Sequence, residues 1–147
     1  MNANSPHDVY EAIRQEHEEL RERIGRIHHA LAQNEVCGPD ISAMLTELCT
    51  ALETHFQNEE HDGFFDEITT HDPRLNPDAK RLCKEHQDML NTATEMARFS
   101  STGADSKARM RELRSRFQAF SKQLMHHESE ENALVQQAYQ EDIGAHD

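Results

Sequence analysis

Long helical segments dominate this sequence. Apolar residues recur every three to four positions through four segments, the pattern of a helix with one buried face. The apolar stripes are Ile13, Leu20, Ile24, Ile27 and Leu31; Ile41, Leu45, Leu48 and Leu52; Leu82, Met89, Ala93 and Met96; and Met110, Leu113, Phe117, Phe120 and Leu124. Three polar breaks containing Gly or Pro separate the segments, at 33–40, 70–77 and 100–106.

The breaks and the helix-start signals define the expected fold. Ser5 before Pro6 reads as a helix cap followed by a first-turn proline, and Asn76 before Pro77 repeats that signal. The second helix is expected to run to about Thr69. No segment has a strand pattern. The sequence therefore predicts an all-α, up-down-up-down antiparallel four-helix bundle, with residues 1–147 forming one domain.

Composition and charge exclude several partners. The formal net charge is −13, whereas nucleic acid and anionic membrane surfaces require a basic face. No run approaches the ~18 apolar residues of a membrane span, and the start of the chain lacks a signal-peptide apolar region. The three cysteines are odd in number and have no CxxC spacing, which suits a reducing compartment. We expect a cytoplasmic protein without nucleic-acid or membrane partners.

Eleven histidines are many for a chain of this length, and their helical phase indicates which of them face the core. At ~100° per residue, each can be placed relative to the apolar stripe of its helix. His17, His55 and His86 each fall about 50° from the stripe centre, and Glu59 falls about 10° from it. Each of the first three helices is therefore predicted to turn one histidine inward.

The stretch HHESEEN (126–132) offers two histidine–glutamate pairs at i, i+4 spacing, and the helical phase separates them. His127 lies about 50° and Glu131 about 10° from the stripe of the fourth helix. His126 and Glu130 lie about 150° and 110° away. We predict that His127 and Glu131 face the core and that the other pair faces solvent.

Three further glutamates adjoin these inward residues. Glu128 lies about 50° on the other side of the stripe, so it is expected at the core boundary, where it could support a site. Glu16 and Glu85 precede the inward histidines of their helices but point about 100° away from those histidines, so they are expected to be solvated.

The predicted inward set has the composition of a metal centre. Its members are His17, His55, Glu59, His86, His127 and Glu131. A lone inward histidine is more often a core residue, but two buried carboxylates beside four imidazoles need compensating positive charge. Protonated histidines would supply it, yet a metal fits better because neutral imidazole and carboxylate are both ligands. Six ligands exceed one tetrahedral zinc, so we expect two ions, each with two histidines, bridged by both glutamates.

Iron, manganese and zinc all suit this mixed ligation, and two bridging carboxylates favour a redox-active di-iron pair. The Glu-x-x-His unit of ferritin-like di-iron bundles is missing from the sequence. The residues three positions before the inward histidines are Arg14, Leu52, Cys83 and Leu124. A ferroxidase-like or ribonucleotide-reductase-like centre is therefore not expected.

The motifs around these residues resemble the hemerythrin-like, or HHE cation-binding, domain. They are EH (16–17), HFQNEE (55–60), KEH (84–86) and HESEEN (127–132), in the order His … HxxxE … His … HxxxE. The resemblance covers essentially the whole chain. It implies a four-helix bundle with a non-haem di-iron centre, bridged by oxo or hydroxo and by carboxylates, with the six inward residues as ligands.

The sequence departs from oxygen-carrying hemerythrins, which have a fifth histidine one turn along the third helix. Here the positions four residues either side of His86 are Leu82 and Leu90. The four-histidine, two-glutamate set is similar to that of the repair-of-iron-centres proteins, which are linked to nitrosative stress and iron–sulfur repair. Those proteins usually carry an N-terminal cysteine-containing segment, whereas this sequence begins at its first helix. Other hemerythrin-like proteins hold zinc.

Three functional hypotheses follow from the residues and the resemblance. The first is a di-iron protein that binds a small oxidant (O2, NO or peroxide) for sensing, scavenging or storage, without an organic substrate. The second is an iron-delivery or iron–sulfur repair factor acting under nitrosative or oxidative stress. The third is a zinc-holding structural or regulatory bundle. The residues specify no protein partner or reductase.

Overall fold

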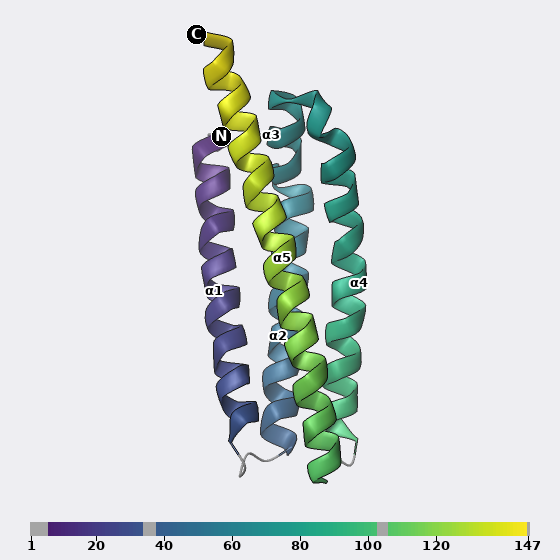
Figure 1. The fold of residues 1–147 in the computed structure, drawn as a ribbon. Helices are drawn as coiled ribbons and strands as arrows, with labels where there is room; N and C mark the ends of the chain where they lie inside the picture. Colours follow the sequence, from purple (N-terminus) through teal and green to yellow (C-terminus); the bar gives the residue numbers. More distant parts are fainter. Residues whose placement is uncertain (1–5, 34–37, 103–105, 147) are drawn as a thin grey trace.

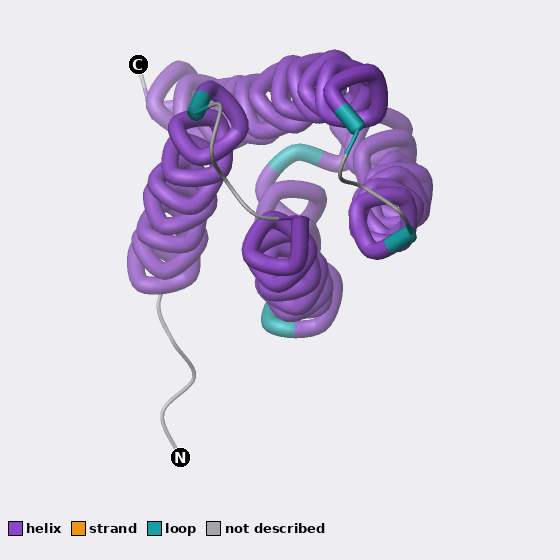
Figure 2. Tube along the Cα trace, turned by 90° about the horizontal axis from the view of Figure 1, so that it is seen from below, coloured by secondary structure: helices purple, strands orange, loops and turns teal. Residues whose placement is uncertain are grey.

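Four long antiparallel helices form the molecule. The computed structural model describes residues 6–33, 38–102 and 106–146. The long helices, α1 (Pro6–Ala32), α2 (Gly38–His61), α4 (Asn76–Ser101) and α5 (Lys107–His146), run alternately down and up (Figure 1). Viewed end on, each helix packs against the next in chain order, and α5 closes the ring against α1 (Figure 2). The predicted all-α bundle is confirmed, with no strand in the described part of the chain.

The apolar stripes read from the sequence form the core of this ring. Every stripe residue is buried except Met110, which is half-buried and packs against the core. Burying one face of each long helix stabilises the bundle by about 25 cal/mol per Å² of apolar surface removed from water. No described helix combines the length and the apolar character needed to cross a bilayer.

The second helix ends earlier than the sequence analysis predicted. α2 stops at His61, and a separate short helix, α3 (Phe64–His71), follows. Gly63 between them has φ of +99°, a left-handed conformation that glycine adopts without steric cost. Asp62–Gly63 is a turn signal that the helical pattern on both sides obscured. The expectation of one helix to Thr69 is therefore wrong.

A 3₁₀ turn, η1 (Pro73–Leu75), joins α3 to α4. Asp72 begins the turn by accepting a hydrogen bond from the backbone N–H of Arg74 at 3.1 Å. The predicted cap at Asn76 is one residue late, because Leu75 occupies the cap position and Asn76 already has helical dihedrals. Ser5, the predicted cap of the first helix, lies outside the described residues.

The core consists of two apolar clusters with a polar layer between them. The larger cluster begins at Leu20 on α1 and at Met89 on α4. The smaller one holds Ile13 and Leu82 of those helices, together with residues of α3 that close this end of the bundle. On α1, α4 and α5 the residues between the two clusters include a histidine, and on α2 His55 directly precedes Phe56, the last α2 residue of the larger cluster. The fold thus gathers four histidines in the layer between the two clusters.

Candidate metal centre

Six residues that the sequence analysis placed inward are buried at this level. His17, His55, Glu59, His86, His127 and Glu131 are each at most 3% exposed. The phase prediction for α5 is confirmed, because His126 has a side chain 77% exposed, whereas that of His127 is 1% exposed. Glu130, the other outward residue, bonds Arg81 at 2.7 Å on the surface.

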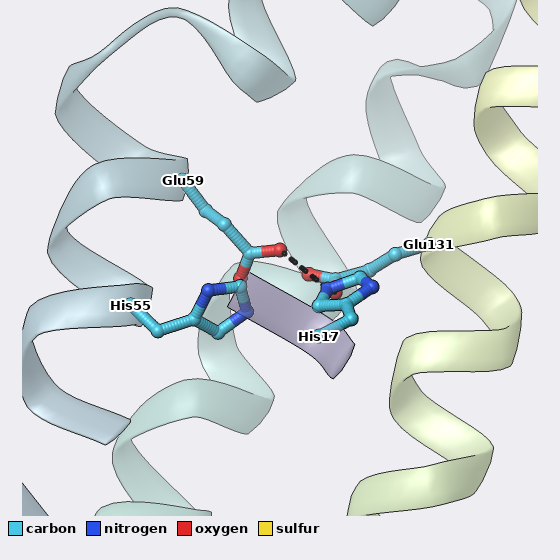
Figure 3. Close-up of side chains that lie close together, drawn as sticks. All are labelled: His17, His55, Glu59 and Glu131. Atoms are coloured by element: carbon cyan, nitrogen blue, oxygen red, sulfur yellow. Dashed lines mark ion pairs between the residues drawn. The ribbon is translucent and has the colours of Figure 1, made fainter. Parts of the chain in front are cut away.

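The six side chains form two groups of four that have both glutamates in common. One group joins His17 and His55 with the two glutamates, and the other joins His86 and His127 with the same pair. Within each group one nitrogen or oxygen from every residue lies within 4.8 Å of the others. Figure 3 shows the first group, with the carboxylates of Glu59 and Glu131 turned toward the histidine rings between α2 and α5. The arrangement matches a pair of ion sites that share two carboxylates.

Helix geometry explains how the sequence produces this pairing. His55 and Glu59 on α2, and His127 and Glu131 on α5, have i, i+4 spacing, which stacks each pair on one helical face. The Nε2 atoms of these histidines lie 3.4 Å and 3.1 Å from a carboxylate oxygen of their own helix. Since α2 and α5 run in the same direction across the bundle (Figure 1), the two carboxylates meet at one level.

Each glutamate also reaches the other two helices. Glu131 Oε1 lies 3.1 Å from His17 Nε2, and Glu59 Oε1 lies 3.1 Å from His86 Nε2. The remaining cross-pairs, Glu59 with His17 and Glu131 with His86, are 3.5 Å apart. Both carboxylates therefore touch three histidines, as bridging groups in a two-ion centre would.

The converging atoms are poorly satisfied by hydrogen bonds alone. Nε2 of His17, His55 and His86, both oxygens of Glu59 and one oxygen of Glu131 have no hydrogen-bond partner. Leaving buried polar atoms unpaired costs about 1–3 kcal/mol each. Imidazole nitrogens and carboxylate oxygens are metal ligands, so cations between them would satisfy these atoms at once. The residues present therefore fit a bound metal.

A second set of carboxylates holds the far side of three rings. In each case Nδ1 of the histidine donates to a glutamate on a neighbouring helix: His55 to Glu16 at 2.7 Å, His86 to Glu60 at 2.7 Å and His127 to Glu85 at 2.8 Å. Metal-binding histidines commonly donate their other ring N–H to a carboxylate, which fixes the tautomer and the ring orientation. These contacts are a second indication of a metal centre.

The expectation that Glu16 and Glu85 are solvated is wrong. Their side chains are 26% and 32% exposed, and each is held in place by a further partner. Asn58 donates to Glu16 at 2.9 Å, and Arg81 donates to Glu85 at 3.0 Å. The sequence analysis measured each glutamate against its own helix, whereas its partner lies on the next one. The repeated Glu-His dipeptide was the available signal.

Two phenylalanine rings cover the side of the centre formed by His86 and His127. Phe56 stacks on the imidazole of His86, with ring centroids 4.0 Å apart and planes inclined by 6°. The ring centroid of Phe65 of α3 lies 5.9 Å from that of the same imidazole. Because both phenylalanines are buried, they limit access of water to the His86 and His127 side.

In the metal-free protein the carboxylates keep the buried histidines protonated. Burial by itself lowers the pKa of His17, but the nearby Glu131 and Glu59 outweigh burial and raise that pKa to about 10. Burial likewise lowers the pKa of His55 and of His86, but Glu16 and Glu59 raise that of His55, and Glu131 and Glu59 that of His86, to about 9. Burial raises the pKa of Glu131, but the histidines outweigh it and hold that pKa well below its usual range. Without metal, the layer is held together by ion pairs.

These shifts predict that the metal-free protein loses stability in alkali. A histidine whose pKa is raised on folding contributes stability that is complete below pH 6.5 and is lost as the pH passes through about 9 to 10. We expect the free energy of unfolding, measured by urea denaturation, to fall by a few kcal/mol between about pH 7 and 10. The metal-loaded protein is the control, because a ring that binds metal through Nε2 is already neutral and releases no proton in this pH range. An equal fall with and without metal would contradict the assignment.

Glu128 is the remaining buried carboxylate of this region. It was expected at the core boundary, and it is 1% exposed. Burial raises its pKa to about 7, opposed by His17, His55 and Arg21. Both its oxygens lack hydrogen-bond partners.

Two surface cavities reach the His17 and His55 half of the centre. One, of about 530 Å³, lies between α1 and α2 and is lined by His55, Glu16 and Asn58 among others. The second, of about 380 Å³, lies between α1 and α5, where His17 and Arg21 line it. A small molecule could approach the first group of ligands from either cavity.

Comparison with known proteins identifies the family. The sequence matches the Hemerythrin HHE cation binding domain family over residues 8–139. No curated protein and no solved structure gives a significant match. The matched range contains all six converging residues and the three carboxylates behind them. On this match, and with a helical bundle whose buried histidines and glutamates can hold metal, the chain belongs to the hemerythrin HHE cation-binding domain family.

Proposed function

We propose that His17, His55, Glu59, His86, His127 and Glu131 hold two iron ions. The observation that carries the proposal is the sharing of Glu59 and Glu131 between two buried groups, each completed by two histidines. A carboxylate common to two groups is the ligand that a pair of closely spaced ions requires, and its charge offsets theirs. The histidines on each side then belong to one ion.

The ligand positions that this donor set leaves open favour iron over zinc. All six donors are imidazole or carboxylate, and no thiolate is among them. Cys83, the cysteine nearest the layer in sequence, is half-buried, and burial raises its pKa to about 12, so it stays a thiol. With two histidines and two shared carboxylates, each ion has ligand positions left for small molecules, which suits redox-active iron.

The proposed activity is reversible or reductive binding of a small oxidant, O2, NO or peroxide, for sensing, scavenging or storage in the cytoplasm. Two irons held by these residues would supply the electrons and an open ligand position. The chain holds the rings in orientation through Glu16, Glu60 and Glu85 and excludes bulk water with Phe56. The cavities beside His17 and His55 support entry of the ligand at that half of the centre.

Metal analysis of protein from iron-supplemented cells tests the proposal. We expect close to two irons per chain, because the two groups offer two sites of equal ligand count. The loaded protein should show a visible ligand-to-iron absorption that bleaches on reduction and changes with O2 or NO. Mostly zinc, at about one ion per chain, would instead favour a structural bundle. Reactivation of damaged iron–sulfur enzymes by the purified protein would favour the repair role.

A further inference from the structure

The carboxylates behind the histidines follow a rule that the structure completes for three of four helices. In each case a glutamate of one long helix accepts a hydrogen bond from the histidine of the next helix in chain order. Glu16 of α1 accepts from α2, Glu60 of α2 accepts from α4, and Glu85 of α4 accepts from α5. Because the helices form a closed ring (Figure 2), the pattern would be completed by a carboxylate of α5 that accepts from the histidine of α1.

The histidine of α1 is His17, and its Nδ1 makes no hydrogen bond. Nδ1 of His17 is buried and has no hydrogen-bond partner, unlike Nδ1 of the other three histidines. On α5, Glu128 is buried, and neither of its oxygens accepts a hydrogen bond. It faces α1, since its Oε2 lies 3.7 Å from Nε of Arg21, one helical turn beyond His17. A buried potential donor and a buried acceptor on adjacent helices thus both lack a hydrogen-bond partner.

Helix direction places Glu128 where the rule requires the fourth carboxylate. On α1 and α4 the accepting glutamate comes one position before the inward histidine, so its side chain is rotated by about −100° around the helix from that histidine. α2 and α5 run the opposite way, so the same sense around the ring requires the position after an inward residue. Glu60 follows Glu59 on α2, and Glu128 follows His127 on α5.

Asn132 is the competing residue, because it follows Glu131 as Glu60 follows Glu59. It also lines the cavity beside His17. However, Asn132 is exposed to solvent, so water can satisfy its amide, whereas Glu128 is buried and neither of its oxygens accepts a hydrogen bond. The burial difference favours Glu128.

We infer that Glu128 is the positioning residue for His17 and accepts its Nδ1–H when metal is bound. The inference rests on the proposed metal centre. A metal ion on Nε2 leaves the ring proton on Nδ1, and a buried N–H there requires an acceptor. Glu128 then orients the His17 ring, as Glu16, Glu60 and Glu85 orient the other three rings.

The test is ¹⁵N–¹H NMR of the imidazole ring protons in protein loaded with zinc, a diamagnetic probe. Wild type should show one slowly exchanging Nδ1–H signal from each of the four ligand histidines, assigned by through-space contacts. Glu128→Ala should remove the His17 signal alone. Glu128→Gln should retain it at higher field, because a neutral amide oxygen accepts more weakly than a carboxylate. Asn132→Ala is the matched control and should leave it unchanged.

Chelator competition gives the second readout. Losing an outer carboxylate typically lowers metal affinity by about 10- to 100-fold. Glu128→Ala should weaken only the ion held by His17 and His55, and Glu85→Ala only the ion held by His86 and His127. The ring signals that change as each ion leaves identify which ion it is.

Each other outcome overturns the inference. Loss of the His17 signal in Asn132→Ala would make the asparagine its partner. An unchanged signal and unchanged affinities in Glu128→Ala would remove Glu128 from the centre, and loss of a bound ion without loss of the ring signal would make it a direct ligand. In all three cases wild type still binds two ions, so the proposed centre survives. A wild type that binds no metal refutes both.

Discussion

Replacing His127 by alanine is expected to lower the metal affinity of the chain by more than about 100-fold, since loss of an outer partner alone costs about 10- to 100-fold. His127 is 1% exposed, and its Nε2 lies 3.1 Å from Glu131. The substitution removes one of the six proposed ligands and the hydrogen bond that its ring makes with Glu85. Metal content after dialysis against a chelator measures the effect.

The adjacent histidine is the matched control. His126 is the same residue type one position earlier, but its side chain is 77% exposed and bonds Glu130 at 3.0 Å. His126→Ala should therefore retain metal at the wild-type level and change stability by less than about 0.5 kcal/mol, as is usual for surface substitutions. Metal loss in His126→Ala with retention in His127→Ala would show that helix α5 is rotated by one residue from the structure described.

Removing the metal is expected to lower the melting temperature by about 8–16 °C for each ion lost. A ligand present at about 1,000 times its dissociation constant stabilises the folded state by about 4 kcal/mol. For a chain of this size each 1 kcal/mol moves the melting temperature by about 2–4 °C. The physical reason is the buried layer, where Glu59 and Glu131 are 0% exposed and lose their cations. Calorimetry of the loaded and chelator-treated protein gives both temperatures.

Glu59→Gln is the control for this effect. The amide keeps the volume of the side chain but cannot bridge two ions with two charged oxygens, so adding metal should raise its melting temperature far less than it raises that of wild type. Identical melting of the loaded and metal-free wild type would mean that the six residues form only a structural polar layer.

The apolar periodicity of the sequence predicted most of the fold. A stripe repeating every three to four residues can be buried only as a helix, and four such stripes with short connections can bury one another only as a bundle. The same phase located the buried polar residues, because a histidine about 50° from a stripe centre stays on the buried face. His17 and His86 were found in this way, each between apolar residues that proved buried.

Interruptions of the helices were harder to predict. α2 ends at His61 because Gly63 adopts φ of +99°, yet the residues that follow resume a helical pattern in α3. A turn of this kind depends on one residue, whereas the helical pattern is an average over many. Only packing against the end of the bundle, where Phe64, Phe65 and Ile68 are buried, requires the chain to turn there.

The helical phase of one segment does not predict side-chain contacts between helices. Glu16 and Glu85 point away from the stripes of their own helices, which by itself indicates solvent exposure. Each gains a histidine partner only because the next helix brings His55 or His127 within 2.8 Å. The burial of Glu128 against Arg21 of α1 likewise depends on how closely α5 approaches α1.

The sequence by itself determined which residues of each helix face inward, because helical phase is a local property set by about 3.6 residues per turn. It thus determined the bundle and the chemical character of its buried layer. The tertiary structure decided which of these residues meet, since the pairing of side chains depends on the order, direction and level of the packed helices. It placed Glu59 and Glu131 between two pairs of histidines and a carboxylate behind three of the four rings. The contacts between helices join residues far apart in the chain, and the apolar pattern of a single helix does not predict them.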